Sequence, residues 1–136
     1  MRGPGLIRDE RGASALEFAL VMPIFLLLVC GMIVYGGWFS LAHSVQSLAT
    51  EAARASIAGL DDEERRDLAI NYIDQQAAPA GLSPAFLTRT VEADDGFTRV
   101  IVRFDVAGSP LMAFRQLIPA PPQVIERNAV VLEGGA

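Results

Sequence analysis

The chain has no lysine, a single histidine and a single cysteine among its 136 residues. All 11 basic residues are therefore arginines, and they are scattered along a chain whose formal net charge is -5. Because no basic stripe is present that could follow a phosphate backbone, the composition argues against nucleic-acid binding. The lone Cys30 rules out an internal disulfide, and it lies inside an apolar run.

Residues that commonly carry catalysis are equally scarce. His43 has no obvious nucleophile beside it, and no phosphate-binding glycine loop or metal-ligand cluster appears. The acidic run 61–64 lacks the ligand spacing of a calcium loop, which favours the first turn of a helix instead. We therefore expect a non-enzymatic protein with no cofactor, no metal site and no small-molecule substrate. Cys30 is expected to be a packed apolar residue, and His43 a residue of the membrane interface.

The chain does contain one long apolar run without a charged side chain, from Phe18 to Ala42. As a helix it would extend about 37 Å, against about 30 Å of bilayer hydrocarbon. Three arginines precede the run and the next, Arg54, follows well beyond it, so the positive-inside bias leaves the N-terminus in the cytoplasm. Everything after about His43 is then outside. The alternative, a cleaved secretory signal peptide, has an apolar core of only about 7–15 residues, which is shorter than this run.

Two features inside the run predict its shape and its depth in the bilayer. Pro23 leaves the carbonyl of Ala19 without its helical donor, which predicts a kink. Tyr35 and Trp38 lie near the far end, where amphipathic rings favour the membrane interface.

A single carboxylate, Glu17, stands where the polar leader meets the apolar run. A charge at the edge of a membrane helix is costly if it enters lipid, so it needs a partner. One interpretation keeps Glu17 at the headgroup level, neutralised by Arg11 or by the helix dipole. The other gives it a functional partner, and the residues alone leave both open.

The spacing around Glu17 resembles a prepilin peptidase recognition site, because Gly12 precedes Glu17-Phe18 by five residues after a short basic leader. In that family pattern cleavage follows the glycine. Here it would leave a new ammonium group on Ala13. The ammonium of a neighbouring subunit could then pair with Glu17, so that each charge offsets the desolvation of the other and the pair fixes the register between helices.

A wider resemblance covers about residues Arg11 to Leu60. The opening RGASALEFALVMP, the glycine-containing apolar stretch and the alanine- and arginine-bearing helix after it resemble the N-terminal region of TadE-like pilus assembly proteins. One departure is Val34, where many relatives carry an acidic residue. The resemblance does not separate the TadE type from its paralogue TadF.

The resemblance implies a minor pilin or pseudopilin that supports assembly of a tight-adherence (Flp) pilus. It implies a bacterial inner-membrane protein with an exported C-terminal domain, or one incorporated into a pilus. The implied partners are the membrane, a prepilin peptidase, other pilin-like subunits and the pilus assembly platform. The alternative is an unprocessed single-pass anchor whose exported domain binds another envelope or secretion component.

Beyond the membrane, apolar residues recur at helical spacing and predict that the first helix continues to about Gly59. They are Val45, Leu48, Ala49, Ala52, Ala53, Ile57 and Leu60. We expect this stripe to pack on the protein's own sheet in preference to a partner. A second helix is predicted from Asp61, as N-cap with Glu64 in the capping-box position, to about Ala78.

The remainder predicts a small sheet. Strands at 88–93 and 98–106 flank Asp94-Asp95-Gly96, which is typical of a hairpin. Ser109-Pro110 predicts a short helix to about Leu117, and a proline-rich connector then leads to a third strand at 123–133. The expected fold is α+β, in which a three-stranded antiparallel sheet packs on the long helix. The expected parts are a leader (1–12), the membrane and amphipathic helix (13–60) and an exported domain (61–136).

Overall fold

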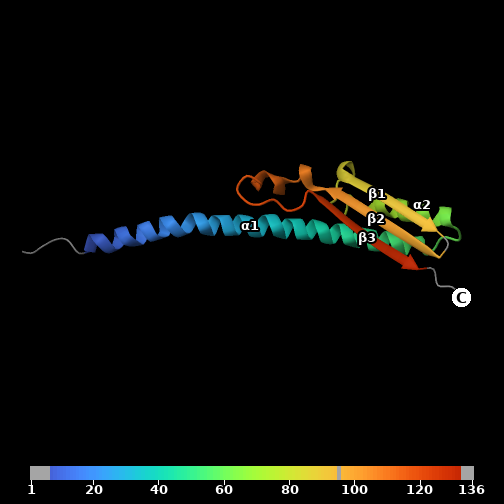
Figure 1. Ribbon diagram of the computed structural model, residues 1–136, viewed down its shortest axis with the longest axis horizontal. Coiled ribbons are helices and arrows are strands. Elements are labelled where there is room, and N and C mark those ends of the chain that lie inside the picture. The colour runs from blue at the N-terminus through green and yellow to red at the C-terminus, as the bar shows by residue number, and fades with distance from the viewer. Residues whose placement is uncertain (1–6, 95, 133–136) are drawn as a thin grey trace, which may run out of the picture.

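The computed structural model describes residues 7–94 and 96–132, with side chains from residue 10 onward. It confirms the predicted α+β fold, with two helices and one three-stranded antiparallel sheet (Figure 1). In chain order the elements are α1 (Ile7–Ser56), α2 (Asp62–Gln76), the 3-10 helix η1 (Pro84–Phe86), β1 (Leu87–Asp94), β2 (Phe97–Asp105), the 3-10 helices η2 (Val106–Gly108) and η3 (Pro110–Phe114), and β3 (Val124–Leu132).

The 50-residue helix α1 runs the length of the molecule and continues unbroken through Pro23. Its N-terminal half projects alone, while α2 and the sheet pack along its C-terminal half (Figure 1). The helix ends at Ser56, three residues before the predicted end at Gly59. A side chain at Gly59 would meet the backbone nitrogen of Arg65 at 2.7 Å, so the turn into α2 requires glycine at this close approach.

The start of α2 follows the prediction. The Asp61 carboxylate accepts a hydrogen bond from the Glu64 backbone N–H at 2.8 Å, which satisfies one of the free donors of the first turn. The Glu64 carboxylate accepts from the N–H of Leu60 at 2.8 Å, one residue earlier than a standard capping box. The helix ends at Gln76, two residues before the predicted end.

The sheet has the order β1-β2-β3. The predicted hairpin between β1 and β2 is confirmed: Val91 lies opposite Val100, and Gly96 in the turn has a φ of +99°, which favours glycine. Asp95 lies outside the described residues. The third predicted strand is β3, which pairs with β2 so that Ile125 lies opposite Phe104.

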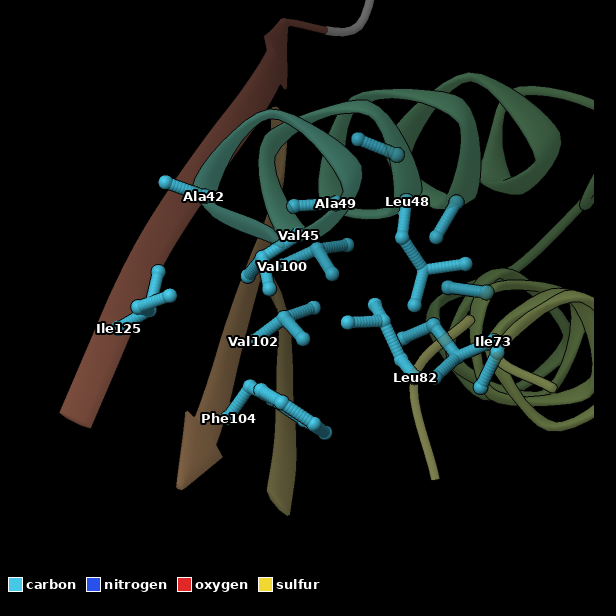
Figure 2. Close-up of a cluster of buried hydrophobic side chains, with 14 of the residues drawn as sticks. Ala42, Val45, Leu48, Ala49, Ile73, Leu82, Val100, Val102, Phe104 and Ile125 are labelled. Atoms are coloured by element: carbon cyan, nitrogen blue, oxygen red, sulfur yellow. The ribbon is translucent and has the colours of Figure 1, made fainter. Parts of the chain in front are cut away.

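The core forms where α1 crosses the inner face of the sheet (Figure 2). From α1 it takes Val45, Leu48, Ala49, Ala52 and Ala53, and from the other elements Ile73, Leu82, Val100, Val102, Phe104 and Ile125. The alanines let the helix lie close to the strands, and the expectation that the stripe packs on the protein's own sheet is confirmed.

Two members of the predicted stripe were assigned wrongly. Ile57 is 61% exposed and Leu60 is 88% exposed. Both follow the end of α1 at Ser56, so the helical phase that buries Ala52 and Ala53 no longer applies to them.

The short helix predicted from Ser109 to about Leu117 is a 3-10 helix that ends at Phe114. The Ser109 hydroxyl accepts from the N–H of Leu111, as the N-cap prediction requires. The tight i to i+3 bonds suit a segment that must turn back toward α1 within a few residues.

Candidate functional site

The N-terminal half of α1 is a free apolar rod. Its large apolar side chains are one third to two thirds exposed. They are Leu16, Phe18, Leu20, Val21, Met22, Ile24, Phe25, Leu26, Leu27, Leu28, Met32 and Ile33. Within the described residues α1 is the one helix long and apolar enough to cross a membrane, and 6% of its most apolar 18-residue stretch is buried in protein. Such a surface is stable in lipid or against other helices, and unstable in water.

Glu17 lies at the start of this rod and is exposed. Across residues 10–94 and 96–132, no hydrogen bond or ion pair engages its carboxylate. Arg11, the intrachain partner that the first interpretation offers, is six residues away, which places it about 120° around the helix from Glu17. The geometry therefore leaves the Glu17 carboxylate open to a group from outside the chain.

The residues predicted for processing lie on the same stretch of α1. Gly12 is exposed inside the helix, and a side chain there would meet nothing within 4 Å. Ala13 and Glu17 are four residues apart and so share one face of the helix.

Phe18 and Pro23 complete the predicted set on the rod. Phe18 is 64% exposed and adjoins Glu17, so an apolar ring stands beside the charge on the open surface. Pro23 is also exposed, and the helix passes through it without a break. The predicted kink at Pro23 stays a prediction.

At the other end of the rod, α1 contacts the segment between β2 and β3, and these contacts were not predicted from the sequence. The Tyr35 hydroxyl donates to the carbonyl of Pro119, and the Trp38 indole N–H donates to the carbonyl of Pro122, both at 2.9 Å. Gly37 lies against Leu111, whose Cδ2 would be 2.7 Å from an added side chain. The one feature of the sequence that could have suggested these contacts is the proline-rich connector, because prolines have carbonyl acceptors but no backbone N–H donors.

His43 and Cys30 are the side chains of the sequence that most commonly take part in nucleophilic catalysis. His43 lines an open groove of about 300 Å³ between α1 and α2, together with Ser47, Glu51 and Tyr72. No hydrogen bond joins His43 to these residues in the described part of the chain, so the relay needed to activate a nucleophile is not formed there. Cys30 is a free, half-buried thiol on the rod.

No group of three or more His, Cys, Asp or Glu side chains able to hold a metal ion occurs within the described ranges. The acidic run 61–64 instead caps α2, as predicted.

The comparisons with known proteins agree with this geometry. The model of a family described as TadE-like protein matches residues 12–54, from the predicted processing glycine to the last turn of α1. No curated protein and no solved structure matches the chain. The matched segment contains the free rod, Glu17 and most of the helical face that packs on the sheet. Over residues 12–54 the chain is therefore similar to TadE-like proteins, as its opening motif predicts.

Proposed function

We propose that the protein is a non-enzymatic, pilin-like subunit that supports assembly of a tight-adherence pilus. The TadE-like match over residues 12–54 carries this proposal, since that family is associated with such pili. It is supported by the bare apolar rod of α1, which is suited first to a bilayer and then to a bundle of like helices. The N-terminus is cytoplasmic, and the domain built on α2 and the sheet is exported across the bacterial inner membrane.

The assembly step depends on a prepilin peptidase that cuts after Gly12. The cut leaves an ammonium group on Ala13 and removes the basic leader that holds the N-terminus in the cytoplasm. A charged side chain inside a membrane helix costs roughly 3 kcal/mol on insertion scales, with higher values by other methods. The pairing of Glu17 with the ammonium of a neighbouring subunit offsets that cost for both charges and sets the axial register.

The partners of the protein are accordingly the membrane, the peptidase, other pilin-like subunits and the assembly platform. The unpaired, exposed state of Glu17 in the single chain supports this assignment, because the carboxylate has no competing intrachain partner among the described residues.

N-terminal sequencing of the protein extracted from membranes tests the proposal. In cells with a prepilin peptidase we expect a mature chain that begins at Ala13, and in cells without one we expect the leader to remain. The variant Gly12→Val should block the cut. Gly31→Val is the matched control, because a side chain at either glycine meets nothing within 4 Å.

Retention of the leader in cells with an active peptidase would contradict processing. The protein would then be an unprocessed single-pass anchor whose exported domain binds another envelope component.

A further inference from the structure

Between β2 and β3 the chain leaves the sheet and returns along α1 toward the apolar rod. We call residues 106–123 the return loop; it contains η2, η3 and the proline-rich connector. Figure 1 shows it extending farther toward the N-terminal half of α1 than β1, β2, β3 or α2 does. It is held there by Tyr35, Trp38 and the contact of Leu111 with Gly37.

The position of these contacts along α1 determines how close the return loop lies to the bilayer that α1 would cross. Tyr35 lies 18 residues after Glu17, which is about 27 Å along a helix axis. A hydrocarbon layer of about 30 Å that begins at Glu17 therefore ends near Gly37. With the bilayer at this position, Pro119 and Leu111, which contact Tyr35 and Gly37, would lie at the level where the hydrocarbon meets water.

The composition of the return loop suits that level. From 106 to 123 it contains no acidic residue, and Arg115 is its one charged residue, although the whole chain has a net charge of -5. Leu117 is 65% exposed, and Phe114 and Ile118 beside it are half-buried. Arg115 is exposed next to them. An arginine beside exposed apolar side chains can keep its charged group among the lipid headgroups while the apolar side chains face the hydrocarbon.

We propose that the tip of the return loop, residues 111–118, is a membrane-contact surface. Leu117, with Phe114 and Ile118, enters the outer leaflet of the bilayer that α1 crosses, and the Arg115 guanidinium pairs with the phosphate of an anionic phospholipid. The inference rests on the proposed membrane anchoring by α1. It adds a second attachment point, so that the exported domain is held at the membrane surface and does not swing on a single helix.

The test uses the full chain reconstituted in vesicles of phosphatidylcholine and phosphatidylglycerol. Cys30→Ala removes the native thiol, and single variants Leu117→Cys, Leu60→Cys and Phe25→Cys each carry an environment-sensitive fluorophore. Leu60 is the matched control, because it is 88% exposed in the turn that follows the far end of α1. Phe25, about 12 Å beyond Glu17 along the helix, reports whether α1 spans the bilayer.

We expect spin-labelled lipid to quench the label at position 117 at least roughly twofold more than the label at position 60, at every protein-to-lipid ratio. If the label at 25 is quenched while 117 behaves like 60, the membrane contact is overturned and the anchoring stands. If 25 is not quenched, anchoring by α1 fails and this inference fails with it. If the label at 117 is shielded without quenching by lipid, and only at high protein density, a second copy of the chain covers the loop and the lipid contact is overturned.

A second measurement tests the phosphate pairing. Quenching at position 117 should increase when phosphatidylglycerol replaces part of the phosphatidylcholine, and Arg115→Gln should abolish that increase. Arg54→Gln is the control, because Arg54 is exposed on the same protein but lies near the far end of α1. An increase that persists in Arg115→Gln would overturn the role of Arg115.

Discussion

At the scale of single residues, the isolation of Glu17 has the clearest consequence. No other acidic or arginine side chain occurs between Arg11 and Glu51, so the apolar part of α1 contains no second charge that could balance the carboxylate in a membrane. Burial of such a group in a helix bundle is stabilising only if a partner satisfies it. The new amine of an adjacent subunit is the partner that the processing site would generate.

Replacement of Glu17 by glutamine tests this pairing. We expect Glu17→Gln to insert in the membrane as the unmodified protein does, because the change removes a charge from the edge of the span. Incorporation into pili or assembly complexes should fall about tenfold or more, since breaking a buried charge pair costs roughly 2–5 kcal/mol. Quantitative immunoblotting of sheared pili and of membranes measures both.

Glu51→Gln is the matched control. Glu51 is exposed on α1 and pairs with Arg54 at 3.6 Å, an exposed pair of little energetic value. Equal incorporation of Glu17→Gln and unmodified protein would rule out the role of Glu17 in register.

At the scale of secondary-structure elements, the helices protect both edges of the sheet. The Arg66 guanidinium of α2 donates to the carbonyls of Val91 and Ala93 on β1, each at 3.4 Å. The Gln46 amide of α1 donates to the carbonyl of Asn128 on β3 at 3.4 Å. Open strand edges invite pairing with other chains, and these side chains occupy part of each edge.

The position of Arg66 on the sheet edge depends on where α2 begins, and Asp61 sets that start. Asp61→Ala removes the N-cap hydrogen bond, so the free energy of unfolding should fall by about 1 kcal/mol. Chemical unfolding of the full chain in detergent, followed by circular dichroism, measures the change.

Asp67→Ala in the body of α2 is the control, because Asp67 is exposed and makes no cap. If Asp67→Ala lowers the free energy of unfolding as much as Asp61→Ala does, the loss of a negative charge, and not the loss of the cap, accounts for the effect.

At the scale of the whole molecule, one helix serves two environments. The N-terminal half of α1 presents apolar side chains outward on every side, whereas the C-terminal half buries one stripe against the sheet. The fold of the sheet and α2 therefore depends on contacts between α1 and the strands, and loss of core volume should separate the sheet from α1.

Ile125→Ala tests this dependence. Ile125 on β3 is 1% exposed within the core, so its truncation should lower the free energy of unfolding by about 2–5 kcal/mol. The same unfolding assay in detergent measures the loss. Val124→Ala is the control on the adjacent position, which is 52% exposed and should change stability little. If both variants lower the free energy of unfolding equally, Ile125 does not lie on the buried face of β3 as described.

The sequence by itself determined the features that depend on local chemistry. A continuous apolar run requires a helix that can cross a bilayer, and Glu17 and Gly12 are placed by simple spacing along it. Asp61 caps its helix through a bond to a residue three positions away, and the alternation in β2 selects its buried face.

Only the tertiary structure decided which surfaces meet across long chain separations. The hydrogen bonds of Tyr35 and Trp38 each reach a proline 84 residues away, and no local period encodes such a contact. The early end of α1 exposes Ile57 and Leu60, although their spacing fits the stripe. The return of the loop onto α1 likewise depends on where the sheet lies on the helix, because β2 and β3 fix both ends of the loop.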